Sequence, residues 1–332
     1  MAVTTVINHN LTVISTFSGF GGSSLGYHRA GFNVIAAVEL IDHAAKTYTK
    51  NFPNTKMYNQ DIRNVGTNLL TDLNLKRGEL TILDGSPPCK VFSSNSGIPP
   101  ASRMGIAELY RGKVKQRADN LVFEQIRLAK ILNPKVVIME NVTGMTRGHA
   151  RFILENSMVE LKNLGYQVKA KILNACHYGA GTSRSRVFML GIRNDLDIVP
   201  SFPHATGKIT TSKEAIKIKP TKADLQEIPS FQNATFHKRV FKETRSGITH
   251  DEHWDYSILD PNKPAKTIIT DPKIFSPENR WLAISEILQL SSFPHDYYAG
   301  ESYRQKYENV GLSVPPCLTE AIGNHIKNLL KL

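Results

Sequence analysis

A single cysteine stands directly after two prolines in the stretch ILDGSPPCKVFSSNSG, residues 82–97. The apolar run before it is typical of a buried strand, and the serines, asparagine and glycine after it are typical of a loop. Because prolines fix the backbone and carry no amide hydrogen, they display Cys89 on a shaped turn rather than inside a regular element. A thiol displayed in this way has the chemistry of a nucleophile.

A carboxylate follows another apolar run, since Glu140 comes at the end of KVVIME, residues 135–140. In an open α/β sheet, ligands bind at the carboxyl ends of the strands, so Glu140 and Cys89 would face one crevice. An acid at this point is also compatible with ordinary capping of the next helix. Beside a strand-end thiol, the role of a general acid is the better interpretation.

A glycine-rich turn, TFSGFGGSSLG at residues 16–26, follows the first apolar run. Glycine permits positive φ and lets a ligand approach the backbone at a helix N-terminus, although a tight packing turn would look the same. Glu39 ends the second run about 20 residues on, where a carboxylate accepts the hydroxyls of a ribose. Asp61 ends a third run and suits an adenine edge. These groups predict a nucleoside-containing cofactor, and glycine spacing unlike GxGxxG weakens a nicotinamide interpretation.

The first part of the chain alternates short β-branched runs, such as LTVIST, with longer amphipathic stretches such as ADNLVFEQIRLAKIL. This pattern predicts an α/β fold, with a doubly wound, mostly parallel sheet and helices on both faces. From about residue 195, prolines and short mixed runs predict a second, smaller and irregular domain. We expect one domain over 1–195 plus 306–332, a second over 196–275, and a hinge or return segment over 276–305.

The composition limits the class of protein. The chain has 332 residues, of which 41% are hydrophobic and 21% charged, so it can bury a core. No apolar run is long enough to span a bilayer and no signal-peptide pattern opens the chain, so we expect a soluble cytoplasmic protein with no membrane partner. Cys89, Cys176 and Cys317 are far apart and lack the spacing of a disulfide framework or a zinc site, so we expect no metal.

The formal charge of +12 favours a polyanionic partner such as nucleic acid, although solvated surface lysines would give the same total. The excess is concentrated in two segments. Residues 101–116 carry four cations against one acid, and residues 207–226 are rich in lysine. Both segments are typical of surfaces that bind phosphate.

The ordered motifs TFSGFGGSSLG, VEL, QDI, SPPCKVFS, MENVTGM and SRSRVFMLGI, followed by RWLAISEILQLSSFP and VGLSVPPCLTEAIG, resemble the DNA (cytosine-5)-methyltransferase family. The resemblance spans nearly the whole chain except roughly residues 196–255. It implies a Rossmann-like fold that binds S-adenosyl-L-methionine, with a target-recognition domain over 196–275. The compact size is similar to that of bacterial and phage modification enzymes, which protect DNA from a companion endonuclease without forming a stable complex with it.

The resemblance also implies a mechanism. Cys89 adds to carbon 6 of a flipped-out cytosine, carbon 5 takes the methyl group of S-adenosyl-L-methionine, and loss of the carbon 5 proton and of the thiol releases 5-methylcytosine. Glu140 protonates or hydrogen-bonds ring nitrogen N3 as charge develops. Arg184 and Arg186 of SRSRVF hold the base oxygen and orient the acid.

For the cofactor, the resemblance implies that Phe17 stacks on adenine, Glu39 holds the ribose, and Asp61 with Ile62 borders the adenine. The glycine-rich turn would pass beside the methionine end. The expected cofactor-binding residues are Phe17, Gly19, Gly21, Gly22, Glu39, Leu40, Asp61, Ile62 and Pro88.

The expected partner is double-stranded DNA, bound by a monomer. We expect the segment from Lys90 to about Gln116 to act as a lid that fills the gap left by the flipped base. Basic side chains of the target-recognition domain would contact phosphates or guanine edges, more of them positioning than specifying. The expected DNA-binding residues are Ser93, Arg103, Arg111, Lys113, Lys115, Lys217, Lys219, Lys238, Arg239 and Arg245.

Three positions depart from the family pattern. Lys90 stands where glutamine is usual, Gly181 and Thr182 replace Pro-Gln, and Leu312 stands where asparagine is usual. These departures keep open a catalytically inactive, sequence-specific DNA-binding paralogue. A tRNA cytosine-5 methyltransferase is a further alternative, disfavoured because the CFT tripeptide associated with that branch is absent.

Overall fold

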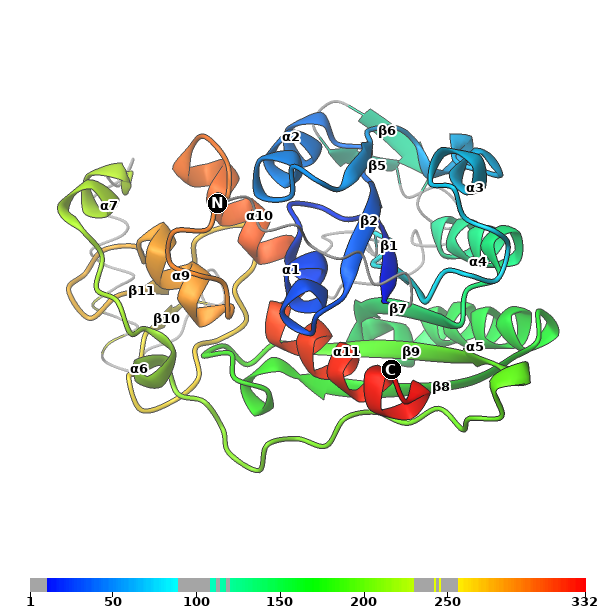
Figure 1. Ribbon diagram of the computed structural model, residues 1–332. Helices are drawn as coiled ribbons and strands as arrows, with labels where there is room; N and C mark the ends of the chain where they lie inside the picture. Colours follow the sequence, from blue (N-terminus) through cyan, green and yellow to red (C-terminus); the bar gives the residue numbers. More distant parts are fainter. Residues whose placement is uncertain are drawn as a thin grey trace, which may run out of the picture. The chain divides into compact units, whose positions relative to one another are not determined.

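The computed structural model describes residues 11–88, 108–111, 114–117, 120–229, 242, 245 and 256–332, which Figure 1 shows as a ribbon. Contacts divide the chain into two compact units. The first unit comprises residues 1–173, 185–204 and 319–332, and the second comprises residues 174–184 and 205–318. These units are defined by contacts alone, and the functional domain boundaries expected from the sequence remain a prediction.

Seven strands form one sheet, in the order β3-β2-β1-β4-β7-β9-β8. Their bounds are Thr12–Thr16 (β1), Asn33–Val38 (β2), Lys56–Tyr58 (β3), Ile82–Gly85 (β4), Val136–Val142 (β7), Tyr166–Asn174 (β8) and Ser185–Arg193 (β9). The pairs from β3 across to β7 are parallel, and β9 runs antiparallel to β7. The expected α/β fold with a mostly parallel sheet is therefore confirmed.

The central strands are continuous buried runs. Every residue of β1 and of β4 is buried, as parallel strands are when helices cover both of their faces. The chain extends the sheet from β1 toward β3 and then, beginning at β4, toward β8. The switch point between β1 and β4 is where open α/β sheets bind ligands, and the glycine-rich turn and the Pro-Pro-Cys turn follow these two strands.

Helices cover both faces of this sheet (Figure 1). Their bounds are Gly22–Arg29 (α1), Asp42–Asn51 (α2), Asn68–Asp72 (α3), Leu121–Leu132 (α4), Gly148–Asn163 (α5) and Pro316–Leu330 (α11). On one face, Leu128 of α4 belongs to the same buried cluster as Leu83 and Val137. On the other face, α11 lies against α1, because a β-carbon added at Gly323 would lie 2.9 Å from the β-carbon of Ala30.

Shorter elements connect these layers. The 3-10 helices are Ile62–Asn64 (η1), Thr143–Thr146 (η4), Ala175–His177 (η5) and Asn194–Leu196 (η6). Strands β5 (Glu108–Arg111) and β6 (Val114–Arg117) form an antiparallel hairpin, so the segment expected as a loop from Lys90 to Gln116 contains regular structure. No helix in the described part of the chain is long and apolar enough to cross a membrane.

The second unit is built from short elements in its described residues. Their bounds are Ser212–Ala215 (α6), Lys222–Glu227 (α7), Ser257–Ile258 (β10), Ile274–Phe275 (β11), Ile284–Leu290 (α9) and Tyr303–Leu312 (α10). Both α6 and α7 begin with a capping box, in which a threonine and an acid satisfy each other's backbone amides. Phe275 and Trp281 stack with ring centroids 4.4 Å apart and anchor the core of this unit.

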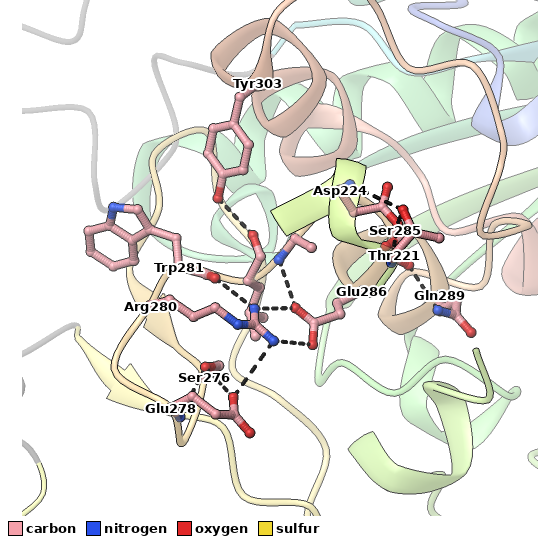
Figure 2. A network of polar contacts seen from close by, with 12 residues as sticks. Thr221, Asp224, Ser276, Glu278, Arg280, Trp281, Ser285, Glu286, Gln289 and Tyr303 are labelled. Carbon is pink, nitrogen blue, oxygen red and sulfur yellow. Dashed lines mark hydrogen bonds and ion pairs between the residues drawn. The ribbon is translucent and has the colours of Figure 1, made fainter. Parts of the chain in front are cut away.

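An ion pair fixes the start of α9 (Figure 2). Arg280 places Nη1 at 2.7 Å from Oε2 of Glu286 and Nη2 at 3.0 Å from Oε1. The same carboxylate accepts the amide of Ala283 at 2.7 Å, so it also caps the helix. Tyr303 donates its hydroxyl to the carbonyl of Leu282 at 2.7 Å, which ties α10 to the same turn. Residues within the motif RWLAISEILQLSSFP therefore fix the start of the helix that the motif forms.

Candidate active site

The glycine-rich turn after β1 has an unusual backbone. Phe17, Gly19 and Gly21 all have positive φ, at 53°, 56° and 102°. Positive φ costs a residue such as Phe17 of order 1–3 kcal/mol and persists only where the surroundings enforce it. A β-carbon added at Gly19 would meet nothing within 4 Å, so the turn borders open space. Gly21 caps α1, whose first residue is Gly22.

Glu39 holds this turn in place. Its Oε2 accepts the amide of Gly19 and its Oε1 accepts the amide of Ile41, both at 2.8 Å, and the residue is 5% exposed. Glu39 therefore joins the turn after β1 to the loop after β2, in which Leu40 is half-buried. Each carboxylate oxygen has two lone pairs, so both can accept a further hydroxyl. An acceptor pair beside a cradle without β-carbons fits the nucleoside of S-adenosyl-L-methionine.

Asp61 contacts Arg63, two residues further along the chain. One oxygen accepts the amide of Arg63 at 2.9 Å and thereby caps η1, and the other lies 3.0 Å from Nη1 of Arg63. Ile62 is buried beside it. Asp61 thus holds the start of η1, and its role at the adenine edge remains a prediction.

The turn that leads to the cysteine is tied to β7. Cys89 itself lies outside the described residues, as does Lys90, and the chain is described up to Pro88, which is half-buried. Asn141 of β7 donates its side-chain amide to the carbonyl of Pro87 at 3.2 Å. This bond was not foreseen, although the amide of the ENV motif was a signal for it. It holds Pro87, which is two residues before Cys89, beside the end of β7.

Glu140 and Arg186 form an ion pair at this strand end. Glu140 lies opposite Phe188 in the β7–β9 register, and Arg186 lies two residues before Phe188, so both side chains leave the same face. Arg186 Nε is 3.1 Å from Glu140 Oε1, and the side chains are only 14% and 10% exposed. Arg186 also donates through Nη1 to the carbonyl of Ser185 at 2.8 Å. The two residues predicted to cooperate are thus in contact.

Arg184 has a different setting. It belongs to the second unit, is 4% exposed and donates through Nη1 to the carbonyl of Ile268 at 2.9 Å. Thr182, one of the unusual positions, is fully buried and donates to the carbonyl of Lys266 at 2.9 Å. Leu312, another, is 39% exposed at the end of α10. The threonine therefore has a structural role, and nothing in the described part of the chain explains the leucine.

Asp84 is a buried acid that sequence analysis missed. It lies in β4, is 1% exposed, and accepts the hydroxyl of Tyr27 at 2.9 Å and that of Ser15 at 3.4 Å. Its pKa is raised to about 7, mainly by burial, with a smaller contribution from the charge of Glu140, and the hydrogen bond from Tyr27 opposes the shift. The signal was visible in ILDG, where a carboxylate interrupts an apolar strand.

The expected DNA-binding positions are only partly described. Lys217 and Lys219 are exposed between α6 and α7, and Arg245 is exposed. Arg111 ends β5 and Lys115 lies in β6, opposite Tyr110. The remaining positions lie outside the described residues and are Ser93, Arg103, Lys113, Lys238 and Arg239.

The parallel sheet with one reversed strand, the glycine-rich turn and the strand-end acid define the class of S-adenosyl-L-methionine-dependent methyltransferases. The fold is shared with a crystal structure of a prophage-encoded Escherichia coli protein named for DNA modification methyltransferase activity, with a TM-score of 0.71 and 23% identity over 97% of this chain and 100% of that one. A DNMT2 variant of Spodoptera frugiperda aligns with a TM-score of 0.67 and 17% identity over 97% and 99% of the two chains.

Residues 11–258 match the family of C-5 cytosine-specific DNA methylases, and the chain belongs to this family. It is 30% identical to the Type II methyltransferase M1.HphI of Haemophilus parahaemolyticus, over 96% of this chain and 87% of that protein. It is 27% identical to M.Eco47II of Escherichia coli, over 98% and 81%. The protein is thus an S-adenosyl-L-methionine-dependent DNA cytosine-5-methyltransferase of the restriction-modification type.

Proposed function

We propose that this chain methylates a flipped-out cytosine within one short duplex sequence through a covalent bond between Cys89 and carbon 6 of the ring. The observation that carries the proposal is the ion pair of Arg186 with Glu140, at the strand end where Asn141 holds the turn that leads to Cys89. A thiol and an acid at one strand edge are what addition to a pyrimidine requires.

In this mechanism the Cys89 thiolate forms a bond to carbon 6, and the electron pair displaced from the ring is stabilised by a proton or hydrogen bond from Glu140 at N3. Arg186 fixes the direction of the Glu140 carboxyl through Nε, which lies 3.1 Å from Oε1. S-adenosyl-L-methionine, when bound, supplies the methyl group. A water molecule then takes the carbon 5 proton, the electron pair of that bond re-forms the ring double bond as the bond to Cys89 breaks, and any proton held at N3 returns to Glu140. The thiolate and the acid are thereby regenerated.

Residues around the β1 and β2 ends would hold the cofactor. Glu39 would accept the ribose hydroxyls, Phe17 would stack on adenine, and Asp61 with Ile62 would border its edge. The glycine cradle at Gly19, Gly21 and Gly22 would admit the methionine end, with Leu40 and Pro88 closing the pocket. The open space beside Gly19 and the two acceptor oxygens of Glu39 support this assignment.

Double-stranded DNA would be bound by a monomer. The exposed Lys217 and Lys219 suit phosphate contact, and the region 196–275 would read the sequence. The biological role would be protection of DNA from a companion endonuclease that forms no stable complex with this chain. A neighbouring nuclease gene, cleavage of host DNA by that nuclease when Cys89 is mutated, and a single sedimenting species of about 37 kDa test these points.

The reaction is tested by incubating the protein with S-adenosyl-L-methionine and unmethylated DNA of genomic complexity, followed by mapping of 5-methylcytosine at single-base resolution. We expect methylation confined to one short motif, and none with tRNA. Cys89→Ser should bind DNA and cofactor but transfer no methyl group. Transfer by Cys89→Ser would contradict the covalent mechanism, and binding without transfer by the wild type would favour the inactive paralogue.

A further inference from the structure

The side chain of Asp84 joins three elements in the core of the first unit. It projects from β4, receives the Tyr27 hydroxyl from α1 at 2.9 Å, and receives the Ser15 hydroxyl from β1 at 3.4 Å. The Ser15–Asp84 pairing in the β1–β4 register places these two side chains next to each other on one face of the sheet. A carboxyl with hydroxyl donors on both oxygens is a specific junction rather than a chance polar residue.

The main chain of Asp84 strengthens the same junction. Its carbonyl accepts the hydroxyl of Thr16 at 3.0 Å. Thr16 is the first residue of the glycine-rich turn, and Asp84 lies five residues before Cys89. Asp84 therefore joins β1 and β4 at the point where the chain leaves the sheet toward the proposed cofactor cradle on one side and toward the nucleophile on the other.

The junction also faces the catalytic acid. Asp84 lies opposite Ile138 in the β4–β7 register, and Glu140 follows two residues later, so both carboxyls lie on the same face. The other titratable or polar groups that act on Asp84 are Tyr27 and Ser23 of α1, Tyr48 of α2 and Ser15 of β1. Arg186 pairs with Glu140. Among the described residues, no cation acts on Asp84.

We propose that Asp84 is a positioning residue for methyl transfer, which sets the spacing between the cofactor cradle and the strand that leads to Cys89. The inference rests on the proposed roles of the glycine-rich turn and Cys89. Ionisation would place a second negative charge on the face that carries Glu140, inside a core where burial penalises charge. The junction would then loosen, and transfer would decline as the pH rises.

The titration range makes this testable. Burial raises the pKa of Asp84 to about 7, so the proton is lost just above neutral pH. Burial also raises the pKa of Tyr27, so the tyrosine remains the donor throughout. We therefore expect kcat/KM for the cofactor, and the cofactor Kd, to worsen as the pH rises from 6 to about 8.5.

Asp84→Asn preserves the shape and the acceptor for Tyr27 but cannot ionise. We expect it to transfer methyl groups at pH 6 within about threefold of the wild type and to lack the decline in cofactor affinity above pH 7. Tyr27→Phe removes a bond that lowers the pKa of Asp84, so its decline should move to higher pH. Tyr166→Phe is the matched control, because Tyr166 donates its buried hydroxyl to the carbonyl of Pro134 and touches no carboxyl at this junction.

Measuring the cofactor Kd against pH in a Cys89→Ser background separates this inference from the proposed chemistry. Identical pH profiles for the Asp84→Asn, Tyr27→Phe and Tyr166→Phe proteins would overturn the role of Asp84 and leave the covalent mechanism intact. Transfer by Cys89→Ser would instead overturn the mechanism, whatever the profiles show.

Discussion

Arg186 and Glu140 meet across two antiparallel strands, with Arg186 Nε 3.1 Å from Glu140 Oε1 and both side chains nearly buried. The contact follows from register, because residues of one parity on β7 and β9 share a face of the sheet. Removing one partner of a buried pair leaves the other charge uncompensated, which usually costs more than the pair contributes. The pair therefore governs the direction of the proposed acid.

Arg186→Ala should lower kcat by about 100-fold, because the acid loses the group that orients it. The KM for DNA should change much less. Single-turnover methyl transfer measures the chemical step directly. Arg193→Ala is the control on the same strand, since Arg193 pairs with Asp195 at the other end of β9. Equal losses for the two variants would show that the effect comes from weakening β9 and not from Glu140.

Glu39→Gln should raise the Kd for S-adenosyl-L-methionine by about tenfold. Only one amide oxygen is left to serve the Gly19 and Ile41 backbone amides, and the new NH2 group faces a donor. Glu79→Gln makes the same change at an exposed turn, where Glu79 accepts the amide of Lys76. Calorimetric titration compares the two, and an unchanged Kd for Glu39→Gln would remove Glu39 from the cofactor site.

The sequence could predict the sheet because its central strands are buried on both faces and read as uninterrupted apolar runs. It could also predict the contact of Glu140 with Arg186, since both lie in motifs of a recognisable family. The partners of Asp84 could not be predicted from the sequence, for a physical reason. A carboxylate inside an apolar run has no partner in the local pattern, and its hydroxyl donors come from residues 57 and 69 positions away.

The second unit was harder to predict for a related reason. Its elements are held by contacts between distant segments, such as Arg184 with the carbonyl of Ile268 and Thr182 with that of Lys266. Apolar periodicity carries no record of such bonds. The same holds for Thr182 as a departure from the family, since only the structure shows that its buried hydroxyl donates to the carbonyl of Lys266.

Gly19→Ala and Gly148→Ala form a matched pair. The two glycines have φ of 56° and 53°, and neither would place a β-carbon within 4 Å of another atom. Each substitution should lower stability by about 1 kcal/mol through backbone strain. Only Gly19→Ala should weaken cofactor binding, because its β-carbon would enter the proposed cradle. Parallel denaturation and cofactor titration test this, and equal affinities would count against the cradle.

Ionisation of Asp84 should lower the stability of the folded protein as the pH rises. The pKa of Asp84 is raised from 3.8 to about 7 in the folded chain, mainly by burial. Between these two pKa values the folded state holds a proton that the unfolded state has released. The contribution of neutral Asp84 to stability is therefore lost as the pH rises through 7. Asp84→Asn should become progressively more stable than the wild type from pH 4 to 8, by up to about 4 kcal/mol.

Asp195→Asn should show the opposite dependence of stability on pH. A hydrogen bond from Arg193 lowers the pKa of Asp195, so its contribution is present at neutral pH and is lost as the pH falls. Denaturation midpoints of the two variants against the wild type should diverge in opposite directions with pH. Parallel curves would mean that Asp84 does not titrate in the folded protein.

The Arg280–Glu286 pair should matter more for stability than an exposed pair of similar geometry. Arg280 is 24% exposed and Glu286 only 9%, and the carboxylate also caps α9, so Glu286→Gln loses a charge-assisted fork and weakens a cap. We expect a loss of about 2–4 kcal/mol. Glu155→Gln breaks the exposed pair with Arg151 on α5, where we expect less than about 0.5 kcal/mol.

Tryptophan fluorescence can localise this effect, because Trp281, one of two tryptophans in the sequence, belongs to the second unit. Trp281 follows Arg280 directly, and its carbonyl accepts Nη1 of that arginine at 2.9 Å. Glu286→Gln should therefore lower the urea midpoint seen by fluorescence, while Glu155→Gln leaves it in place. Equal shifts for both variants would mean that the ion pair at α9 contributes no more than an ordinary surface contact.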